Sequence, residues 1–168
     1  MIPYGTAVKI LSDCGCNQNV IDHCLAVSLL SVNTAKKLLE SGKSVDVELV
    51  RIGSVLHDLG RARTHAIDHA AVGAGMAVEF GLDPRIVQII KRHIGGGISR
   101  LEAKDLGLPD DDYIPVTIEE KIVAHCDNLM RGTERISMDE CISRMRSRNM
   151  SKESIDRVRA LADEVSVC

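Results

Sequence analysis

The chain has almost no aromatic residues. Among its 168 residues there is no tryptophan, one phenylalanine (Phe80) and two tyrosines (Tyr4 and Tyr113). Without aromatic side chains there is no platform on which successive bases could stack, which argues against a protein that binds single-stranded nucleic acid. Hydrophobic residues still make up 45% of the chain. We therefore expect a core of aliphatic side chains, a composition suited to helix packing.

Long apolar runs and secretion signals are also missing. No stretch approaches the roughly 20 apolar residues that a membrane-spanning helix needs, and the N-terminus lacks the basic region and apolar run of a signal peptide. None of the cysteines is in C-x-x-C spacing; they are Cys14, Cys16, Cys24, Cys126, Cys141 and Cys168. We therefore expect a cytoplasmic protein with reduced thiols and no membrane partner. The C-x-C pair could bind a metal or respond to oxidation, but it is more typical of ordinary residues at a turn.

Alternating strand patterns are nearly absent, and helix signals divide the chain. Helices are predicted at 17–42, 44–60 and 68–81, from Asp83-Pro84 onward, and after the caps Thr117, Ser137 and Ser151, the first two of these three as capping boxes with Glu120 and Glu140. The sequence thus predicts an all-α fold with seven or eight helices. We expect a single domain over 1–168, with a core at 17–131 and C-terminal helices at 137–165.

Charge and the C-terminal segment leave alternatives open. The net charge is -3, yet residues 61–104 hold seven Lys/Arg against four Asp/Glu. This mildly basic segment could attract a small anion, or it could be solvated helix faces. The last helix has an apolar stripe of Ile155, Val158 and Leu161. That stripe could pack on the core or on a second subunit, so a homo-oligomer is one of two interpretations.

Polar residues fall on faces that should be buried. His23 lies in an apolar stripe with Val20 and Val27, and His93 ends the stripe that contains Ile86, Ile89 and Ile90. Asp127 lies four residues after Val123 and is thus drawn toward the core, where an unpaired carboxylate is costly. A single inward histidine is usually an ordinary core residue. The number of these residues, on separate helices, is what points to a common partner.

An adjacent pair, His57-Asp58, ends another apolar segment. Together with His23 and Asp127 it would bury imidazoles and carboxylates that a divalent cation could satisfy jointly. A ligand set without thiolates suits iron, manganese, nickel, cobalt or zinc. His69 and His93 could hold a second ion, with Asp58 bridging the two. One or two such ions can polarise a phosphoryl oxygen and activate a water for attack.

The motifs "HDLGR", "DHAAVGAGMA", "GLDPRIVQIIKRHIGGG" and "EEKIVAHCDNL" resemble the HD superfamily of metal-dependent phosphohydrolases. The resemblance covers about residues 17–131. It includes the bacterial dinucleoside tetraphosphate hydrolases of this superfamily and small archaeal HD proteins. It implies a first metal held by His23, His57, Asp58 and Asp127, and a second held by His69, His93 and Asp58. The chain departs from the hydrolase pattern in Cys14 and Cys16, in His65 and in its C-terminal helices, which puts the substrate in doubt.

Other residues near these motifs are candidates for the chemistry. Arg61 stands where many relatives have a lysine and would contact a phosphate as a bidentate fork, although the dipole at a helix end also favours an arginine there. His65 could be a substrate contact or a proton donor. Gly96 and Arg100, in the segment "GGGISR", are candidates for substrate binding. His125 lies two positions before Asp127 and should point elsewhere.

The sequence therefore predicts a metal-dependent phosphohydrolase in which Asp58, Arg61 and His65 are catalytic. Its substrate would be a nucleotide or another small phosphate ester or anhydride, attacked by metal-activated water. Two other classes fit the same histidine-rich pattern: a di-iron oxygenase of the superfamily, and a non-catalytic nucleotide-binding regulatory module. A purely structural metal is a further reading of the same residues.

Overall fold

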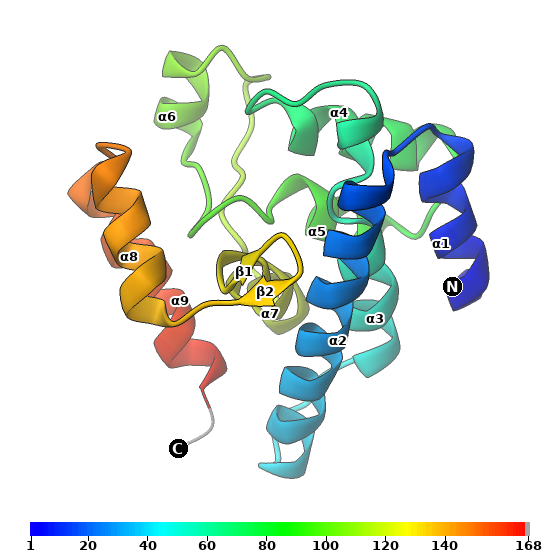
Figure 1. Cartoon of the computed structure of the whole chain (residues 1–168), viewed down its shortest axis with the longest axis horizontal. Coiled ribbons are helices and arrows are strands. Elements are labelled where there is room, and N and C mark those ends of the chain that lie inside the picture. Colours follow the sequence, from blue (N-terminus) through cyan, green and yellow to red (C-terminus); the bar gives the residue numbers. More distant parts are fainter. Residues whose placement is uncertain (167–168) are drawn as a thin grey trace.

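The computed structural model describes residues 1–166, and it is helical almost throughout (Figure 1). Over these residues there are nine α-helices, one 3-10 helix (η1) and one two-stranded hairpin. The elements are, in order, α1 Tyr4–Asp13, α2 Gln18–Glu40, α3 Val47–Leu56, η1 Leu59–Ala62, α4 His69–Glu79, α5 Pro84–Lys91, α6 Arg100–Asp105, α7 Ile118–Asn128, β1 Met130–Arg131, β2 Glu134–Arg135, α8 Met138–Ser147 and α9 Lys152–Val165. The predicted all-α class is confirmed.

Most helix starts follow the predicted caps. The Asn17 side chain accepts a hydrogen bond from the Val20 N–H, and Pro84 is the first residue of α5 after its cap Asp83. The second helix differs from the prediction. It begins after Asp46, whose carboxylate accepts the Leu49 N–H, rather than after Ser44, and it ends at Leu56 instead of continuing to Gly60. The chain then tightens into η1, and His57 and Asp58, at the junction of the two helices, are buried.

Two predicted capping boxes are only half formed. Thr117 and Ser137 each accept a backbone N–H as N-caps. The glutamates three residues later are engaged elsewhere: Glu120 binds Arg92 and the Val116 N–H, and Glu140 pairs with Arg131. The complete capping box lies at Ser99 and Glu102, at the start of the short helix α6.

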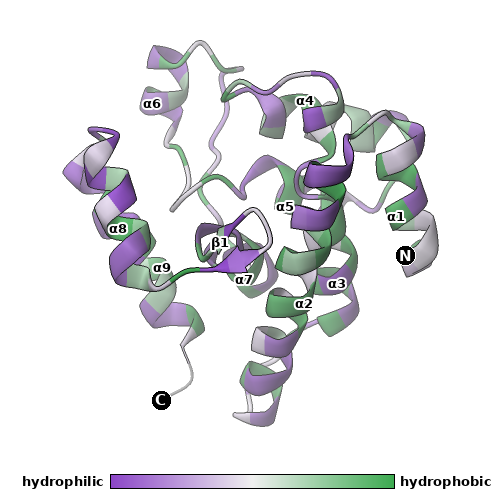
Figure 2. Ribbon diagram, viewed as in Figure 1, coloured by the Kyte–Doolittle hydropathy of each residue, from purple (hydrophilic) through white to green (hydrophobic). Residues whose placement is uncertain are grey.

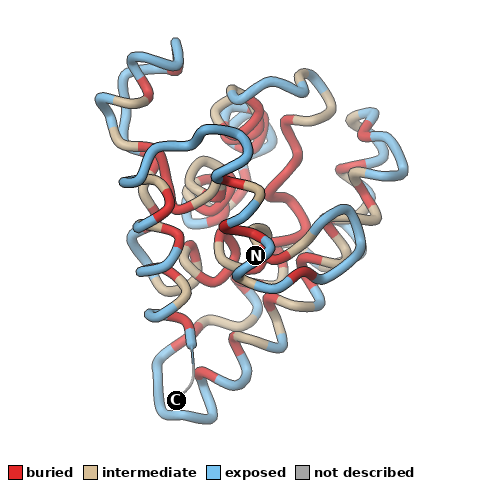
Figure 3. Tube along the Cα trace, turned by 60° about the vertical axis from the view of Figure 1, so that its left-hand side comes forward, coloured by how far each residue is buried: buried red, intermediate tan, exposed pale blue. Residues whose placement is uncertain are grey.

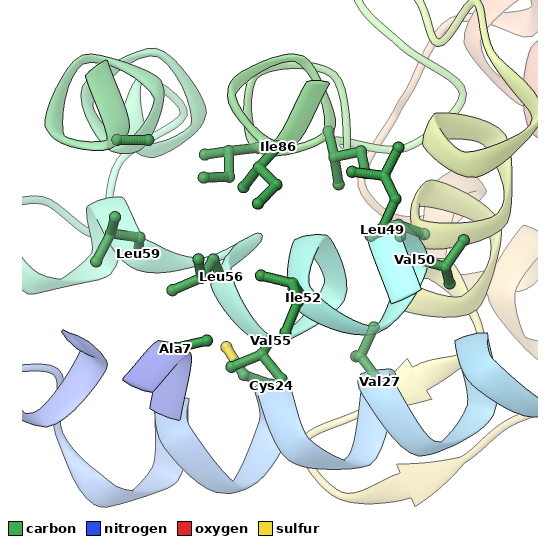
Figure 4. Packing of buried hydrophobic residues seen from close by; sticks show 14 of the residues in the cluster. Ala7, Cys24, Val27, Leu49, Val50, Ile52, Val55, Leu56, Leu59 and Ile86 are labelled. Carbon is green, nitrogen blue, oxygen red and sulfur yellow. The ribbon is translucent and has the colours of Figure 1, made fainter. Parts of the chain in front are cut away.

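The main core lies around α3. Figure 4 shows α3 between α2 on one side and α5 on the other, with Val55 and Ile52 reaching toward the residues of the two neighbouring helices. Leu56, Leu59, Ile89 and Ile90 are almost fully buried. Hydrophobic and hydrophilic residues alternate along α2 and α3 (Figure 2), and buried positions follow the inner faces of the helices (Figure 3). This core fixes the helix ends from which the polar cluster described below projects.

The C-terminal helices form a second small core. Ile142 and Met145 of α8 pack with Ile155 and Val158 of α9, and α9 lies against α7. In Figure 1, α8 stands on the side of α7 opposite to α2. The stripe Ile155, Val158 and Leu161 is therefore buried within the chain itself, so it does not need a second subunit to cover it.

The cysteines occupy ordinary structural positions. Cys14 caps the end of α1, and the Cys16 thiol lies 3.8 Å from the Leu59 carbonyl. Burial raises the pKa of Cys14 and raises that of Cys16 to about 11, so both favour the unreactive thiol form. Among the described residues no cysteine belongs to a group that could hold a metal, and Cys168 lies outside them. Between residues 1 and 166, none of the helices combines the length and the apolarity that spanning a membrane requires.

Candidate metal centre

Six polar side chains from distant parts of the chain meet at one point. His23 projects from α2, His57 and Asp58 from the junction of α3 and η1, His69 from the first turn of α4, His93 from the end of α5, and Asp127 from the last turn of α7. These are the six residues that the sequence analysis selected as metal ligands. The structure brings all of them together, and their role as ligands remains a prediction.

A close backbone approach places Asp58 beside His69. A Cβ on Gly60 would lie 1.9 Å from the His69 carbonyl oxygen, and one on Gly73 would lie 2.7 Å from the Gly60 nitrogen. Only glycine at these positions lets η1 rest directly on α4. The Asp58 Oδ1 atom consequently lies 3.2 Å from the His69 Nε2 atom and 3.5 Å from that of His93.

All four histidines are oriented in the same way. Each ring lies with Nδ1 at 2.7 to 2.8 Å from a backbone carbonyl, the acceptors being Gly132, Ser54, Ala66 and Ile90 for His23, His57, His69 and His93. A carbonyl oxygen can only accept, so in each ring Nδ1 carries the proton. In the neutral form of each ring the Nε2 lone pair is then directed into the cluster, which is the arrangement of metal-binding histidines.

The converging Nε2 atoms face acceptors rather than donors. His69 and His93 bring their Nε2 atoms within 3.1 Å of each other. The His57 ring is fully buried, and its Nε2 atom makes no hydrogen bond with any described residue. Two nitrogen lone pairs that face each other at 3.1 Å repel, and a buried His57 Nε2 atom without a hydrogen bond is costly. A proton or a cation bound among these nitrogen atoms would remove both costs.

The carboxylate of Asp58 faces two sub-clusters. Its Oδ1 atom faces His69 and His93, and its Oδ2 atom lies 3.9 Å from the His57 Nε2 and 4.0 Å from the His23 Nε2. On the second side Asp127 Oδ1 completes the set, 2.9 Å from His23 Nε2 and 3.5 Å from His57 Nε2. Three groups have ligand atoms within 4.8 Å of one another; they are His23–His57–Asp58, His57–His93–Asp127 and Asp58–His69–His93. These groups could hold a metal.

The pKa values in the cluster are strongly perturbed. Burial opposes charge on Asp58, but the facing imidazoles of His57, His69 and His93 outweigh it and hold its pKa far below its ordinary value. Burial likewise opposes charge on Asp127, and the imidazoles of His23 and His57 lower its pKa. Both carboxylates are thus ionised at neutral pH, which is the state that binds a cation.

The histidines respond in opposite directions. Burial opposes protonation of His23, but its hydrogen bond to Asp127 outweighs that effect and raises the pKa. For His93 burial dominates and lowers the pKa, so its ring is neutral and available as a ligand. The arrangement therefore offers anionic carboxylates and inward-facing imidazole nitrogen atoms to a positive ion.

A cavity of about 490 Å³ opens from this cluster. Its volume falls within the range of about 300–1,000 Å³ found for small-molecule sites. Besides the cluster it is bordered by Arg61, His65 and Gly95, and on the far side by residues of α8. The Arg61 guanidinium donates to Asp58 Oδ1 at 3.2 Å and to the His65 carbonyl at 2.8 Å. Arg61 and His65 therefore border the site, and their catalytic roles remain predictions.

Three other sequence candidates lie away from the cavity. Gly96 packs against α9, where a Cβ would lie 2.7 Å from the Arg157 Cβ, and Gly95 rather than Gly96 borders the cavity. Arg100 lies on α6 and pairs with Asp110 at 2.6 Å. The structure therefore does not place Gly96 or Arg100 at the cavity, because Gly96 packs against α9 and Arg100 is held in an ion pair. His125 borders a different hollow, as its position on α7 predicted.

Sequence reasoning missed part of the site. The Asn128 side chain donates to the Gly95 carbonyl at 2.8 Å and so fixes the loop beside the cluster. Arg144 of α8 and Arg148, the residue that follows the end of α8, border the cavity. A spacing of four residues is typical of positions on one side of a helix. The spacing does not reveal that this side borders the cavity.

Comparison with known proteins agrees with this geometry. The model of the family described as HD domain matches residues 20–132. An uncharacterized protein of Methanocaldococcus jannaschii is 48% identical over 164 residues, which are 97% of this chain and 96% of that protein. A tRNA (cytidine(56)-2'-O)-methyltransferase of Thermoplasma volcanium is 39% identical over 94% of this chain, but the chain spans only 48% of its length.

A solved structure has the same helical arrangement. The HD domain of the L. monocytogenes phosphodiesterase PgpH, in complex with cyclic-di-AMP, superposes with a TM-score of 0.60 at 17% identity. The match covers 93% of this chain and 92% of the other. This likeness shows that the two chains share a fold.

Proposed function

Because this chain belongs to the HD domain family, we propose that it is a metal-dependent phosphohydrolase whose centre is the His/Asp cluster. The observation that carries the proposal is the set of four imidazoles whose Nδ1 atoms are all committed to backbone carbonyls, leaving four Nε2 atoms directed at two carboxylates. Such an acceptor-only set suits a cation. We assign His23, His57, Asp58 and Asp127 to one ion, and Asp58, His69 and His93 to a second.

A divalent cation held there would polarise a phosphoryl oxygen and lower the pKa of a water. The nitrogen- and oxygen-rich ligand set favours iron, manganese, nickel, cobalt or zinc. Asp58 lies between the two sub-clusters, where its carboxylate orients the attacking water and accepts its proton. Arg61 holds Asp58 in place and presents the rest of its guanidinium to the non-reacting phosphate oxygens. His65 lies at the cavity rim, where its imidazole can protonate the leaving group.

The substrate is a nucleotide or another small phosphate ester or anhydride. The cavity volume suits a molecule of that size, and the structural neighbour PgpH is a phosphodiesterase with a bound dinucleotide. The methyltransferase name of the Thermoplasma relative belongs to a protein of which this chain spans about half. Methyl transfer needs a site for a methyl donor, whereas the cluster here offers acceptors for a cation.

The test is a hydrolysis assay on protein reloaded with Mn²⁺, using nucleotides and bis(4-nitrophenyl) phosphate. We expect turnover that a chelator abolishes and that Asp58→Asn lowers by about 100-fold or more, because several kcal/mol of charge stabilisation depend on that carboxylate. His125→Gln is the matched control, since this residue lies on α7 near Asp127 but borders another hollow. No turnover with any divalent ion would refute the proposal, and oxygen-dependent chemistry by the ferrous protein would favour an oxygenase.

A further inference from the structure

Residues of α8 and of the turn that follows it form one wall of the cavity. We infer that Arg144 and Arg148 on this wall form a second phosphate subsite, so that the enzyme prefers nucleotides with at least one phosphoryl group besides the one at the cluster. This inference rests on the proposed function for the identity of the reacting phosphate. The substrate class it names is small nucleotides with several phosphoryl groups, joined as dinucleotides or as polyphosphate chains.

The two guanidinium groups are free to bind a ligand. Neither Arg144 nor Arg148 makes an ion pair or a side-chain hydrogen bond with residues 1–166. Other arginines near the site are engaged: Arg61 with Asp58, Arg157 with Glu102, and Arg92 with Glu120. Arg144 is only partly exposed, although it has no such partner. Two unpaired guanidiniums one helical turn apart suit the oxygen atoms of a phosphate.

The charge of the cavity favours an anion on this wall. Among the residues that border it, the carboxylates are those of Asp58 and Asp127. Both belong to the cluster, where a divalent cation would neutralise them. Of the other charged residues in the lining, Arg61 pairs with Asp58, whereas Arg144 and Arg148 have no opposing acid among the described residues. Their part of the cavity is therefore positively charged and attracts a second anionic group.

The cavity also has an apolar face. Aliphatic and thioether side chains border it, among them Ile67, Met130, Ile136, Met145 and Met150. Methionine is polarizable and adapts to flat rings, so this face suits a nucleobase. A ligand that contacts both the arginines and this apolar face therefore combines a planar apolar group with a second phosphate. This is the chemistry of a nucleotide and not of a simple sugar phosphate.

The wall is part of the folded body. Ile142 and Met145 anchor α8 on α9, and α9 is tied to the rest of the chain by Arg157, which donates to Glu102 at 2.7 Å and to the Gly97 carbonyl at 3.2 Å. Lys121 of α7 also pairs with Glu164 of α9. The backbone that carries Arg144 is thus held relative to the cluster before any ligand arrives, which lowers the entropic cost of binding.

Equilibrium binding on chelated protein tests this subsite without turnover. The probes are diadenosine tetraphosphate and adenosine monophosphate, titrated calorimetrically into wild type, Arg144→Gln, Arg148→Gln and the double variant. We expect the tetraphosphate to bind more tightly than the monophosphate, and each substitution to weaken the tetraphosphate about tenfold while changing the monophosphate by no more than about twofold. Arg146→Gln is the matched control, because this exposed arginine lies on α8 but does not border the cavity.

The outcomes separate this inference from the proposed function. Equal affinity for the two probes, or equal losses in Arg144→Gln and Arg146→Gln, would overturn the subsite even if the enzyme hydrolyses phosphate. Tighter, arginine-dependent binding of a short single-stranded RNA would overturn the assignment to small nucleotides. Arginine-dependent tetraphosphate binding in a protein that hydrolyses nothing would support the subsite and refute the phosphohydrolase.

Discussion

At the scale of single residues, two glycines determine whether the cluster can assemble. Gly60 and Gly73 let η1 and α4 touch, and this contact places Asp58 against His69. Neither needs unusual backbone angles, since neither has a positive φ. What they supply is space. A methyl group at either position must push the two elements apart, and the carboxylate and the imidazole would separate with them.

Two glycines on α4 give a matched test of this point. Gly73→Ala is expected to lower the free energy of unfolding by about 1–3 kcal/mol, because its Cβ would meet the Gly60 backbone. Gly75→Ala is expected to raise it by up to about 1 kcal/mol, because that glycine is exposed in a helix with no atom within 4 Å of an added Cβ. Urea unfolding measures both. Equal effects of the two substitutions would mean that the contact between η1 and α4 is loose.

At the scale of helices and loops, the pair of Glu102 and Arg157 joins the C-terminal helices to the loop after His93. Glu102 caps α6 through Ser99 and accepts from Arg157 at 2.7 and 2.8 Å. Partial burial opposes charge on this carboxyl, but the bonds from Arg157 and Ser99 outweigh it and lower its pKa to about 2 from an ordinary 4.5. The unfolded chain therefore takes up this proton at a higher pH than the folded protein does.

This difference predicts a pH dependence. The stabilisation by Glu102 is complete above about pH 4.5 and is lost as the pH falls toward about 2. Glu102→Gln is expected to cost about 1 kcal/mol at neutral pH, a modest value because the pair is partly exposed. The difference in the free energy of unfolding between this variant and wild type should disappear as the pH falls from about 4.5 to about 2. Glu153→Gln on α9 is the control. If the difference in unfolding free energy between Glu102→Gln and wild type stayed constant down to pH 2, the Glu102 carboxylate would not be its source.

The sequence predicted these elements where local signals decide. Caps such as Asn17, Thr117 and Ser151 act within one turn, so the helices that follow them were found. The helix α1 begins at Tyr4, after Pro3, which supplies no side-chain cap, and α6 has only six residues, so both were missed. Their addition gives nine α-helices among residues 1–166 instead of seven or eight. The cap Ser44 was wrong because Asp46 supplies the better-placed acceptor for the Leu49 N–H.

The candidate site was predictable to a similar extent. Periodicity located His23, His93 and Asp127 on inward faces, and the family resemblance supplied the pairing among them. The cavity wall could not be found in this way. The face that α8 presents to the cluster depends on how α9 packs against α7. This packing is set by tertiary contacts of residues such as Val158 and Gly96. Gly96 was taken for a phosphate contact for the same reason.

At the scale of the whole molecule, the fold brings together residues that are more than 100 positions apart in the sequence. His23 and Asp127 meet at 2.9 Å because α2, α3, α5 and α7 share one core. A cluster of this kind is unfavourable alone, since lone pairs and like charges face one another. A bound cation converts the same contacts into stabilising ones and links the integrity of the fold to the chemistry of the site.

The most direct test of this account is the metal content of the purified protein, measured by inductively coupled plasma mass spectrometry after reloading and dialysis. Wild type is expected to retain one or two divalent ions per chain. Asp58→Ala should retain none, because its carboxylate faces both sub-clusters, whereas His125→Ala should match wild type. A wild-type protein that retains no metal, or an Asp58→Ala variant that retains as much as wild type, would contradict the account.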